Sequence, residues 1–320
     1  MRPSAQQRGM AIISALLIAA VVAVIAAGMI SRQSVFTREL ESLQQRAQGQ
    51  GVLQASLAWS REVLAEQRRV DPLVRLDQGW ARPIAGLPVG EHGAVFQGRL
   101  EDEQGKFNLR NLVVEEQPDA QALATFERLC ALIGLAAPVA QAIAARVIDG
   151  YPRRQAPVAE AVHGFDSGRA TSPGAASRPV PARRPMLRSL DQLAVPGLDA
   201  EGLARLRRVA TVLPANTWIN GNTASAEVLA AQVPGLSVDK ARQLIAERDG
   251  GRWFVNRGDF VNRLQMPHVV LESVPVGITS DWFRLHGVAR SGSREVRLEA
   301  LLLLRGQAPL AQVVWARVGA

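Results

Sequence analysis

The side chains that most often carry out catalysis are few in this sequence and lie far apart. The chain of 320 residues has a single cysteine, Cys130, which excludes an intrachain disulfide and a cysteine-based metal site. The four histidines lack the spacing of metal ligands, and there is no Gly-x-Ser-x-Gly motif; the glycine before Lys106 lacks the spacing of a phosphate loop. The histidines are His92, His163, His268 and His286. We therefore predict no enzyme activity and no catalytic residue, and we expect Cys130 to be a small buried apolar side chain on a helix.

The N-terminal residues suggest that the chain itself is chemically modified, rather than that it catalyses a reaction. A short basic leader, "MRPSAQQRG", ends at Gly9, and a run without any charge follows directly from Met10 to Ile30. A helix of this length spans about 30 Å, the hydrocarbon thickness of a bilayer, and it is longer than the apolar part of a cleaved secretory signal. The leader arginines, Arg2 and Arg8, place the short N-terminus in the cytoplasm. The sequence thus predicts a single membrane span, with the rest of the chain exported.

The join between Gly9 and Met10 resembles the class III signal of type IV pilins and type II secretion pseudopilins. In that family a prepilin peptidase, a membrane-embedded aspartyl peptidase, cuts after the glycine, and the new N-terminal residue is methylated. The resemblance implies cleavage after Gly9 and methylation of Met10. Most members have a glutamate as the fifth residue after the cut, whereas this chain has Ser14. An unpaired carboxylate in the bilayer costs several kcal/mol, so a hydroxyl suits a subunit that begins a fibre, and equally a plain anchor that never polymerises.

The rest of the sequence must supply the elements that position such a segment. A helical pattern continues beyond the apolar run at Leu43, Ala47, Leu53, Leu57 and Leu64. Alternation of apolar and polar residues predicts strands over 94–103, 280–290, 294–305 and 311–318. The last three would form an antiparallel meander with aliphatic residues facing one way. The predicted fold class is α+β: a long N-terminal transmembrane helix packed on an antiparallel pilin-like sheet, with a large all-α insert.

The middle of the sequence has the pattern of that insert. Asp119 is placed to cap a helix, and a second helix follows it before residue 151. Residues 152–186 hold six prolines and few large apolar side chains, which predicts a flexible surface loop. The segments 195–209 and 233–247 share a Val-Pro-Gly-Leu start followed by an amphipathic pattern, which suggests two small helical hairpins. We divide the chain into a cleaved leader (1–9), a transmembrane helix (10–30), the first part of a pilin-like domain (31–117), the helical insert (118–270) and the C-terminal strands of the pilin-like domain (271–320).

Three segments closely resemble the K-type minor pseudopilin of type II secretion, general secretion pathway protein K. They are 101–113, 218–237 and 248–260, and together with the Gly9–Met10 join they extend the likeness over most of the chain. The resemblance implies a subunit at the tip of the pseudopilus that primes assembly and supports export across the outer membrane. It also implies partners, namely the I-type and J-type minor pseudopilins, other pseudopilins, the prepilin peptidase and inner-membrane lipid. The implied location is the inner membrane, with the soluble domain in the periplasm.

Relatives of this type can bind calcium in the insert, but the matching stretch here is poor in oxygen ligands. Its carboxylates are Asp149, Glu160 and Asp166, and arginines stand between them. Calcium takes six to eight oxygens, usually including several carboxylates. We expect no metal and no cofactor, and calcium stays an implication of the resemblance alone.

The main alternative is a membrane-anchored helix-hairpin-helix protein that binds DNA, of the competence-receptor kind. The formal net charge of +8 favours it, as does a basic group formed by Arg205, Arg207, Arg208 and Lys240. Such hairpins hold phosphate through a Gly-x-Gly turn, however, and the turns here read Gly-Leu-Asp and Gly-Leu-Ser. We therefore expect no nucleic-acid partner.

Two further patterns have a structural interpretation. The tryptophans are scattered as core anchors would be: Trp59, Trp80, Trp218, Trp253, Trp282 and Trp315. In "INGNTAS", Asn220, Asn222 and Thr223 indicate a turn and a helix cap rather than a binding site.

Overall fold

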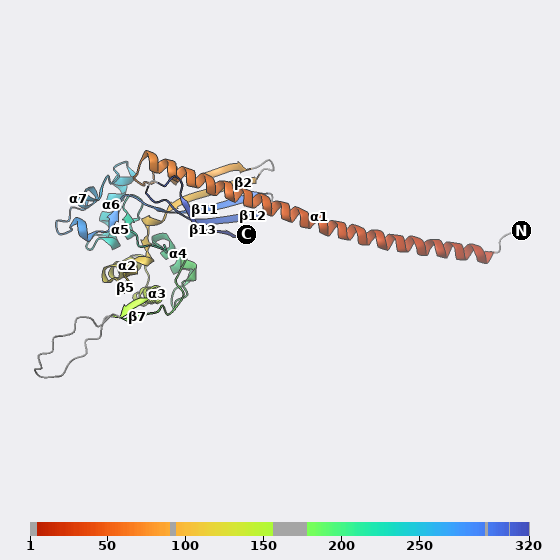
Figure 1. The fold of residues 1–320 in the computed structure, drawn as a ribbon, viewed down its shortest axis with the longest axis horizontal. Helices are drawn as coiled ribbons and strands as arrows, with labels where there is room; N and C mark the ends of the chain where they lie inside the picture. Colours follow the sequence, from red (N-terminus) through yellow and green to blue (C-terminus); the bar gives the residue numbers. More distant parts are fainter. Residues whose placement is uncertain (1–4, 90–93, 156–177, 292–293, 307, 320) are drawn as a thin grey trace, which may run out of the picture.

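The computed structural model describes residues 5–89, 94–155, 178–291, 294–306 and 308–319. The side chains of residues 5–15, 30–31, 34–50 and 52–53, and of a few residues beside the gaps, lie outside the described part. A five-stranded sheet is the centre of the fold (Figure 1), with the end of a long helix against one face and a helical region beside it.

The long helix, α1, runs without interruption from Ala5 to Val70. Gly49 and Gly51 do not break it, since one glycine costs a helix only about 1 kcal/mol. Its last turns pack on the sheet through Leu57 and Leu64, and the rest extends away as a rod (Figure 1).

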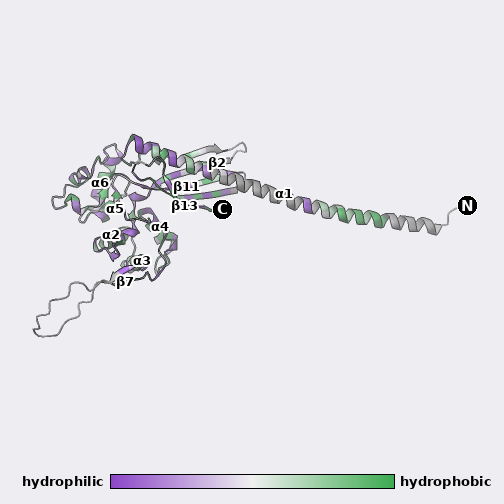
Figure 2. Cartoon of the chain, viewed as in Figure 1, coloured by the Kyte–Doolittle hydropathy of each residue, from purple (hydrophilic) through white to green (hydrophobic). Residues whose placement is uncertain are grey.

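The part of α1 between Leu16 and Met29 is apolar and exposed. Figure 2 shows it as a hydrophobic band, and its large side chains are more than half exposed, Leu16 and Leu17 at 65% each. A search of the described residues finds no helix that is long and apolar enough to cross a membrane.

The sheet is antiparallel throughout and has the order β1-β2-β11-β12-β13. Its strands are β1 (Ile84–Val89), β2 (Ala94–Asp102), β11 (Trp282–Ser291), β12 (Arg294–Leu303) and β13 (Gln312–Gly319). The four strands expected from alternation are confirmed as β2, β11, β12 and β13. The sequence analysis did not resolve β1, which adds an edge strand beside β2.

The face of the sheet toward α1 is an apolar core built around a phenylalanine and two glycines. Gly98 of β2 pairs directly with Gly287 of β11, and the fully buried ring of Phe96 lies over both. A Cβ atom would come 2.8 Å from this ring at Gly98 and 2.5 Å from it at Gly287, closer than real carbon contacts. The glycines therefore make the space that the ring fills. Trp80 completes this core with an edge-to-face contact to Phe283, at 5.3 Å between ring centroids.

The helical region lies in the sequence between β2 and β11. Its helices are α2 (Ala120–Leu132), α3 (Ala137–Ile148), α4 (Ala200–Val209), α5 (Ala226–Gln232), α6 (Val238–Asp249) and α7 (Arg257–Leu264). Five of them begin at a side-chain cap, as expected for Asp119; the others are Asp199, Ser225, Ser237 and Asn256. The region has its own core, in which Phe126, Ile143 and Leu229 are fully buried. Cys130 is buried in it, as predicted, and burial raises the pKa of its thiol to about 12.

Short elements join the helices to one another and to the sheet. Two parallel pairs, β3 (Phe107–Asn108) with β8 (Ala210–Thr211) and β9 (Ile219–Asn220) with β10 (Val276–Gly277), connect distant segments. Of the predicted loop 152–186, the described ends include a ribbon of β6 (Arg153–Gln155) and β7 (Arg178–Val180), and 156–177 lie outside the described residues. The other short elements are η1 (Gly79–Ala81), η2 (Glu103–Gly105), η3 (Leu109–Leu112), β4 (Val113–Val114), β5 (Gln117–Pro118), η4 (Leu190–Gln192) and η5 (Leu271–Ser273).

The interpretation of the tryptophans as core anchors is wrong for two of the six. Trp80 and Trp282 are buried, but Trp59 is 40% exposed on α1 and Trp218 is 51% exposed. The ring of Trp218 instead lies beneath the guanidinium of Arg257, 4.2 Å from its centroid. Spacing along the chain does not distinguish such a surface stack from a core position.

Candidate functional site

The sheet and the helical region meet at a set of buried polar side chains, which comes from segments that the sequence analysis had singled out. Asp102 ends β2 and is almost fully buried. Its Oδ2 accepts hydrogen bonds from Asn220 Nδ2 at 3.0 Å, Thr223 Oγ1 at 2.6 Å and Ser280 Oγ at 2.6 Å, and its Oδ1 accepts from the Gln104 amide at 2.8 Å. Burial raises the pKa of Asp102 above its ordinary value, and these donors offset part of that effect.

The two asparagines of "INGNTAS" extend this contact into the helical region. The Asn220 amide also donates to the Val74 carbonyl at 3.0 Å, and its Oδ1 accepts from the backbone of Asn222. Asn222 in turn exchanges two hydrogen bonds with the backbone of Phe254, at 2.9 and 2.8 Å. Ser225 caps α5. The turn expected at Asn220, Asn222 and Thr223 is confirmed, but the helix cap is Ser225 rather than one of these three residues. The asparagines instead make buried hydrogen bonds between three distant parts of the chain.

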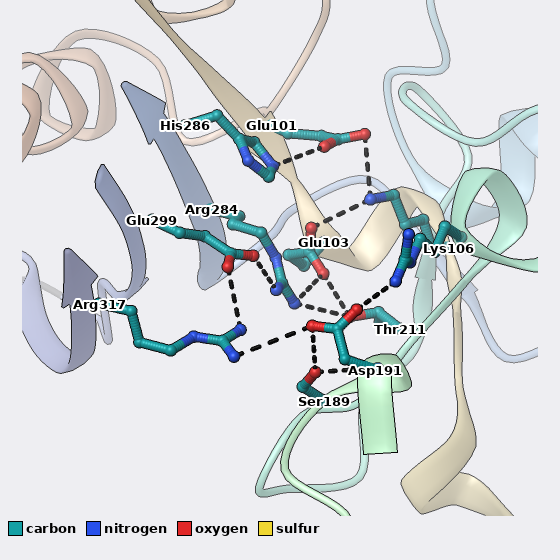
Figure 3. A network of polar contacts seen from close by, with 11 residues as sticks. Glu101, Glu103, Lys106, Ser189, Asp191, Thr211, Arg284, His286, Glu299 and Arg317 are labelled. Carbon is teal, nitrogen blue, oxygen red and sulfur yellow. Dashed lines mark hydrogen bonds and ion pairs between the residues drawn. The ribbon is translucent and has the colours of Figure 1, made fainter. Parts of the chain in front are cut away.

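A second buried acid, Glu103, lies in η2 beside Asp102. Its carboxylate accepts hydrogen bonds from Lys106 Nζ at 3.1 Å, from Arg284 Nη2 at 2.9 Å and from the hydroxyl of Thr211 (Figure 3). Burial alone would raise the pKa of Glu103, but the charges of Lys106 and Arg284 outweigh it and hold the pKa below the ordinary value. Thr211 belongs to the helical region and Arg284 to the sheet, so Glu103 joins the two.

The charged set continues across the sheet face that lies opposite α1. Glu299 of β12 accepts hydrogen bonds from Arg284 at 2.8 Å and from Arg317 of β13 at 2.9 Å. Arg317 also approaches Asp191 of η4, whose other cation is Arg207 of α4 (Figure 3). Burial alone would raise the pKa of Asp191, but the Ser189 hydroxyl and Arg207 hold it below the ordinary value. Charges of opposite sign therefore alternate from β11 through β12 and β13 to the helical region.

Glu101 and His286 complete the set at its outer side. The Glu101 carboxylate lies 3.0 Å from Lys106 Nζ and 3.4 Å from His286 Nε2. Burial would raise the pKa of Glu101, but His286 and Lys106 lower it to about 2. We call this connected set of charged and polar side chains the junction network: Glu101, Glu103, Lys106, Ser189, Asp191, Arg207, Thr211, Arg284, His286, Glu299 and Arg317.

The junction network is suited to holding two parts of a protein together rather than to chemistry. Each carboxylate in it has at least one cation partner, so none is left as a free general base. Within the described ranges, no group of three or more His, Cys, Asp or Glu residues is arranged to hold a metal ion. Leaving one buried member without its partner is costly, which disfavours arrangements of the helical region that separate Thr211 from Glu103.

The predicted processing and assembly residues fall in the first turns of α1. Gly9, Met10 and Ser14 are part of this helix, but their side chains lie outside the described residues. Cleavage, methylation and the role of Ser14 therefore stay predictions.

Of the three carboxylates weighed for calcium, Glu160 and Asp166 lie outside the described residues. Asp149 is paired with Arg153 at 2.7 Å, and its carbonyl oxygen accepts from the amides of Arg183 and Arg184. An arginine thus occupies the position beside Asp149 where a cation would bind.

The basic residues weighed for DNA binding are largely engaged with the protein itself. Arg205 pairs with Glu201, Arg207 with Asp191, and Lys240 donates to Gln265. The two Val-Pro-Gly-Leu turns do share a backbone form, since Gly197 and Gly235 have φ of +81° and +84°. The helices that follow these turns, α4 and α6, are capped by Asp199 and Ser237. An aspartate at this position repels phosphate.

Sequence reasoning missed most of the junction network. Arg284, His286 and Glu299 have the alternation of an ordinary half-buried strand, whose polar face is expected to be in water. The available signal was "EDEQGK", where three acids and a lysine surround a turn, but the other two partners of Glu103 besides Lys106 are 108 and 181 residues away.

Comparison with known proteins gives a consistent result. Two family models, each described as type II secretion system (T2SS), protein K, match residues 105–215 and 219–279. The chain is 26% identical to the type II secretion system protein K of Pseudomonas aeruginosa, over 92% of this chain and 88% of that protein. It is 25% identical to the protein of the same name from Aeromonas hydrophila, over 93% of each.

A solved structure has a similar fold. It is a chain in the crystal structure of the GspK-GspI-GspJ complex from the enterotoxigenic Escherichia coli type 2 secretion system, with a TM-score of 0.64 and 20% identity. The likeness covers 89% of this chain and 99% of that chain. These comparisons give no support to the DNA-binding alternative.

Proposed function

Since this chain belongs to the type II secretion system protein K family, we propose that it is the minor pseudopilin at the tip of the pseudopilus, where it primes assembly and supports export across the outer membrane. Its partners in this proposal are an I-type and a J-type minor pseudopilin. The similar solved chain, whose title names a complex of GspK, GspI and GspJ, supports this choice.

The observation that carries the proposal is the buried polar contact between a large helical region and the sheet of a pilin-like subunit. The pilin-like part comprises residues 31–117 and 271–320, and the insert comprises 118–270. The Thr211 hydroxyl donates to the buried Glu103 carboxylate and Asn220 donates to the buried Asp102 carboxylate, and these hydrogen bonds join the insert to the pilin-like part. A bulky insert held in one orientation would hinder a further subunit from stacking above, which suits the end of a fibre.

We also propose that the N-terminal segment is processed and anchors the protein in the inner membrane. Prepilin peptidase would remove residues 1–9, Met10 would be methylated, and residues 10–30 would cross the bilayer once with the soluble domain in the periplasm. The sequence supports this, because Met10–Ile30 carries no charge. The exposed apolar side chains between Leu16 and Met29 also favour contact with lipid and neighbouring helices.

The test is to express the full chain with its I-type and J-type partners and isolate it from membranes. We expect the three proteins to copurify, and mass spectrometry to find N-methylmethionine at Met10. Immunogold labelling should place the protein at fibre ends. An intact Met1 would contradict the processing, and label along the whole fibre would contradict the tip position.

A substitution at Ser14 tests why the family glutamate is absent. A glutamate at the tip would have no subunit ahead to supply a positive N-terminus, so Ser14→Glu is expected to reduce tip incorporation and secretion. Ser14→Thr keeps a hydroxyl and is the matched control, for which both should be unchanged. Normal secretion and incorporation with Ser14→Glu would refute this explanation.

A further inference from the structure

The strand β13 leaves one edge of the sheet open. It is the last strand in the order β1-β2-β11-β12-β13, and within the described residues only β12 pairs with it. Natural edge strands are usually covered, or protected by charges, prolines or bulges, because their free N–H and C=O groups can pair with another chain. Here Val313 and Val314 are 38% and 40% exposed, and Val318 is also exposed. The register of β13 against β12 shifts at Val314, so the regular part of the edge runs from Trp315 to Gly319. This stretch combines free backbone groups with the exposed Val318 and is suited to pairing.

An apolar cavity of about 470 Å³ lies beside this edge. One wall consists of Val314 and Trp315 of β13, and the other consists of Met186 and Leu187 with Leu213. Met186 is 46% exposed, which is unusual for a large apolar side chain in a cavity wall. The volume is in the range of a binding pocket, so it can receive a few side chains of an added strand.

The surroundings of this cavity are basic. Arg188 and Arg317 line it, and no aspartate or glutamate does. Arg317 is neutralised by Glu299 and Asp191, whereas the exposed side chain of Arg188 makes no polar contact with any described residue. Two more exposed arginines, Arg183 and Arg184, precede it in the chain and likewise lack side-chain partners within the described part. The unbalanced positive charge selects an acidic occupant.

We propose that the β13 edge and the adjoining cavity bind an extended, acidic segment of a partner protein, which adds to the sheet as a sixth strand. Backbone hydrogen bonds to β13 supply affinity. Alternate side chains point to opposite sides of the strand, so the side that faces the cavity carries both the apolar residues that enter it and the acidic residues that reach Arg188, which lines it. This inference goes beyond the proposed function and does not rest on it, because it follows from the free edge, the cavity and the charge alone.

The test uses the full chain in detergent micelles and a labelled eight-residue peptide in which valine and aspartate take turns at the odd-numbered positions, on one side of the strand, with serine at the even-numbered positions. Fluorescence anisotropy at low ionic strength should show saturable binding. Hydrogen exchange should show added protection of the β13 amides, residues 312–319. A peptide of the same pattern with N-methyl groups on alternate amides lacks donors along one edge, and it should bind at least about tenfold more weakly, a difference of ~1.4 kcal/mol. A lysine–valine peptide should be weakened to a similar degree by like-charge repulsion.

Two variants assign the binding to this surface. Arg188→Glu should weaken the aspartate–valine peptide about tenfold, because it reverses the unpaired charge at the cavity. Arg82→Glu is the matched control: Arg82 is also exposed and without a side-chain partner among the described residues, but it lies just before β1, at the opposite edge of the sheet. Its effect should be within about twofold. The proposal is overturned if the peptide does not bind, if the N-methylated or lysine peptide binds equally well, or if both variants have the same effect. The peptide controls use the unmodified protein and stay decisive if a variant fails to fold.

Discussion

Different interactions attach the rest of the protein to the two faces of the sheet. Toward α1, contact is made mainly by apolar side chains packed around Phe96, and the buried polar groups of α1 among the side chains described there are Ser56 and Ser60. The partly buried Arg61 and Arg68 add hydrogen bonds to the Ala311 carbonyl and to Asp281. The opposite face carries ionised groups around Glu103 and Arg284, which the helical region contacts through Thr211 and Asp191. An apolar patch of Leu213, Trp282, Leu301 and Leu303 lies beside them. Burial of apolar surface is non-directional and contributes most of the stability, whereas a buried ion pair adds little stability but is intolerant of misplacement.

The difference explains how one sheet can serve two purposes. The helix of a fibre subunit has to be attached firmly, and shape-matched apolar packing achieves this. A helical insert that must keep one orientation is better fixed by charges that match in only one arrangement. We propose this specificity for the junction network, and the following predictions test whether the two faces differ in the way described.

The largest effect is expected on the α1 face. Phe96→Ala removes a fully buried ring from above Gly98 and Gly287 and leaves a cavity that the glycines cannot fill, so it should lower the free energy of unfolding by about 3–5 kcal/mol. Phe96→Leu keeps most of the volume and should cost roughly 1 kcal/mol. Urea unfolding of the full chain in detergent, followed by circular dichroism, measures both. A loss below about 1 kcal/mol for Phe96→Ala would mean that this core can collapse around the gap.

On the opposite face, deletion of the whole pair should cost less than the sum of the two single deletions. Arg284→Met leaves Glu103 buried with Lys106 as its remaining cation, and should cost about 3 kcal/mol. The double variant Glu103→Leu/Arg284→Met removes the unpaired acid as well and should be more stable than the sum of the two single changes by about 1–3 kcal/mol. The same urea experiment gives all three values. Additive effects would show that the two side chains do not act as a pair.

The elements on both faces could largely be predicted from the sequence, but the charged contact between them could not. Alternation along 280–290 and 294–305 locates β11 and β12, and Asp119 marks the start of α2. The same alternation assigns Arg284 and Glu299 to a solvated face. Only tertiary packing of a region that begins more than a hundred residues earlier buries them. Leu301 and Leu303 did indicate in the sequence that part of this face is covered, since β12 is apolar on both faces where Leu213 packs on it.

Acid should weaken the insert face selectively. The pKa of Glu101 is lowered to about 2 from an ordinary value of 4.5, so its stabilisation is complete above about pH 5 and is lost as the pH falls toward 2. Glu103 acts in the same direction, whereas Asp102, whose pKa is raised, favours the folded state as it is protonated. In Glu101→Gln, the fall in urea midpoint between pH 6 and pH 3 should therefore be smaller than in the parent. Phe96→Leu should retain the parent's pH dependence, and an equal fall in Glu101→Gln and the parent would contradict the assignment.

The smallest effect is expected for a solvent-exposed ion pair whose N–O distance is nearly that of the pairs made by Arg284. Arg242 of α6 lies 2.7 Å from Asp239, almost the distance that separates Arg284 from its acids, but the side chains of this surface pair are 63% and 86% exposed. Water and salt screen such a pair, so Arg242→Gln should cost about 0.3 kcal/mol, and 0.5 M NaCl should remove the difference. Arg284→Met should keep most of its cost in the same salt because Glu103, one of its two acids, is shielded from solvent. If the two substitutions cost the same, distance rather than burial would determine the contribution of a charge here, and the contrast between the two faces would lose its physical basis.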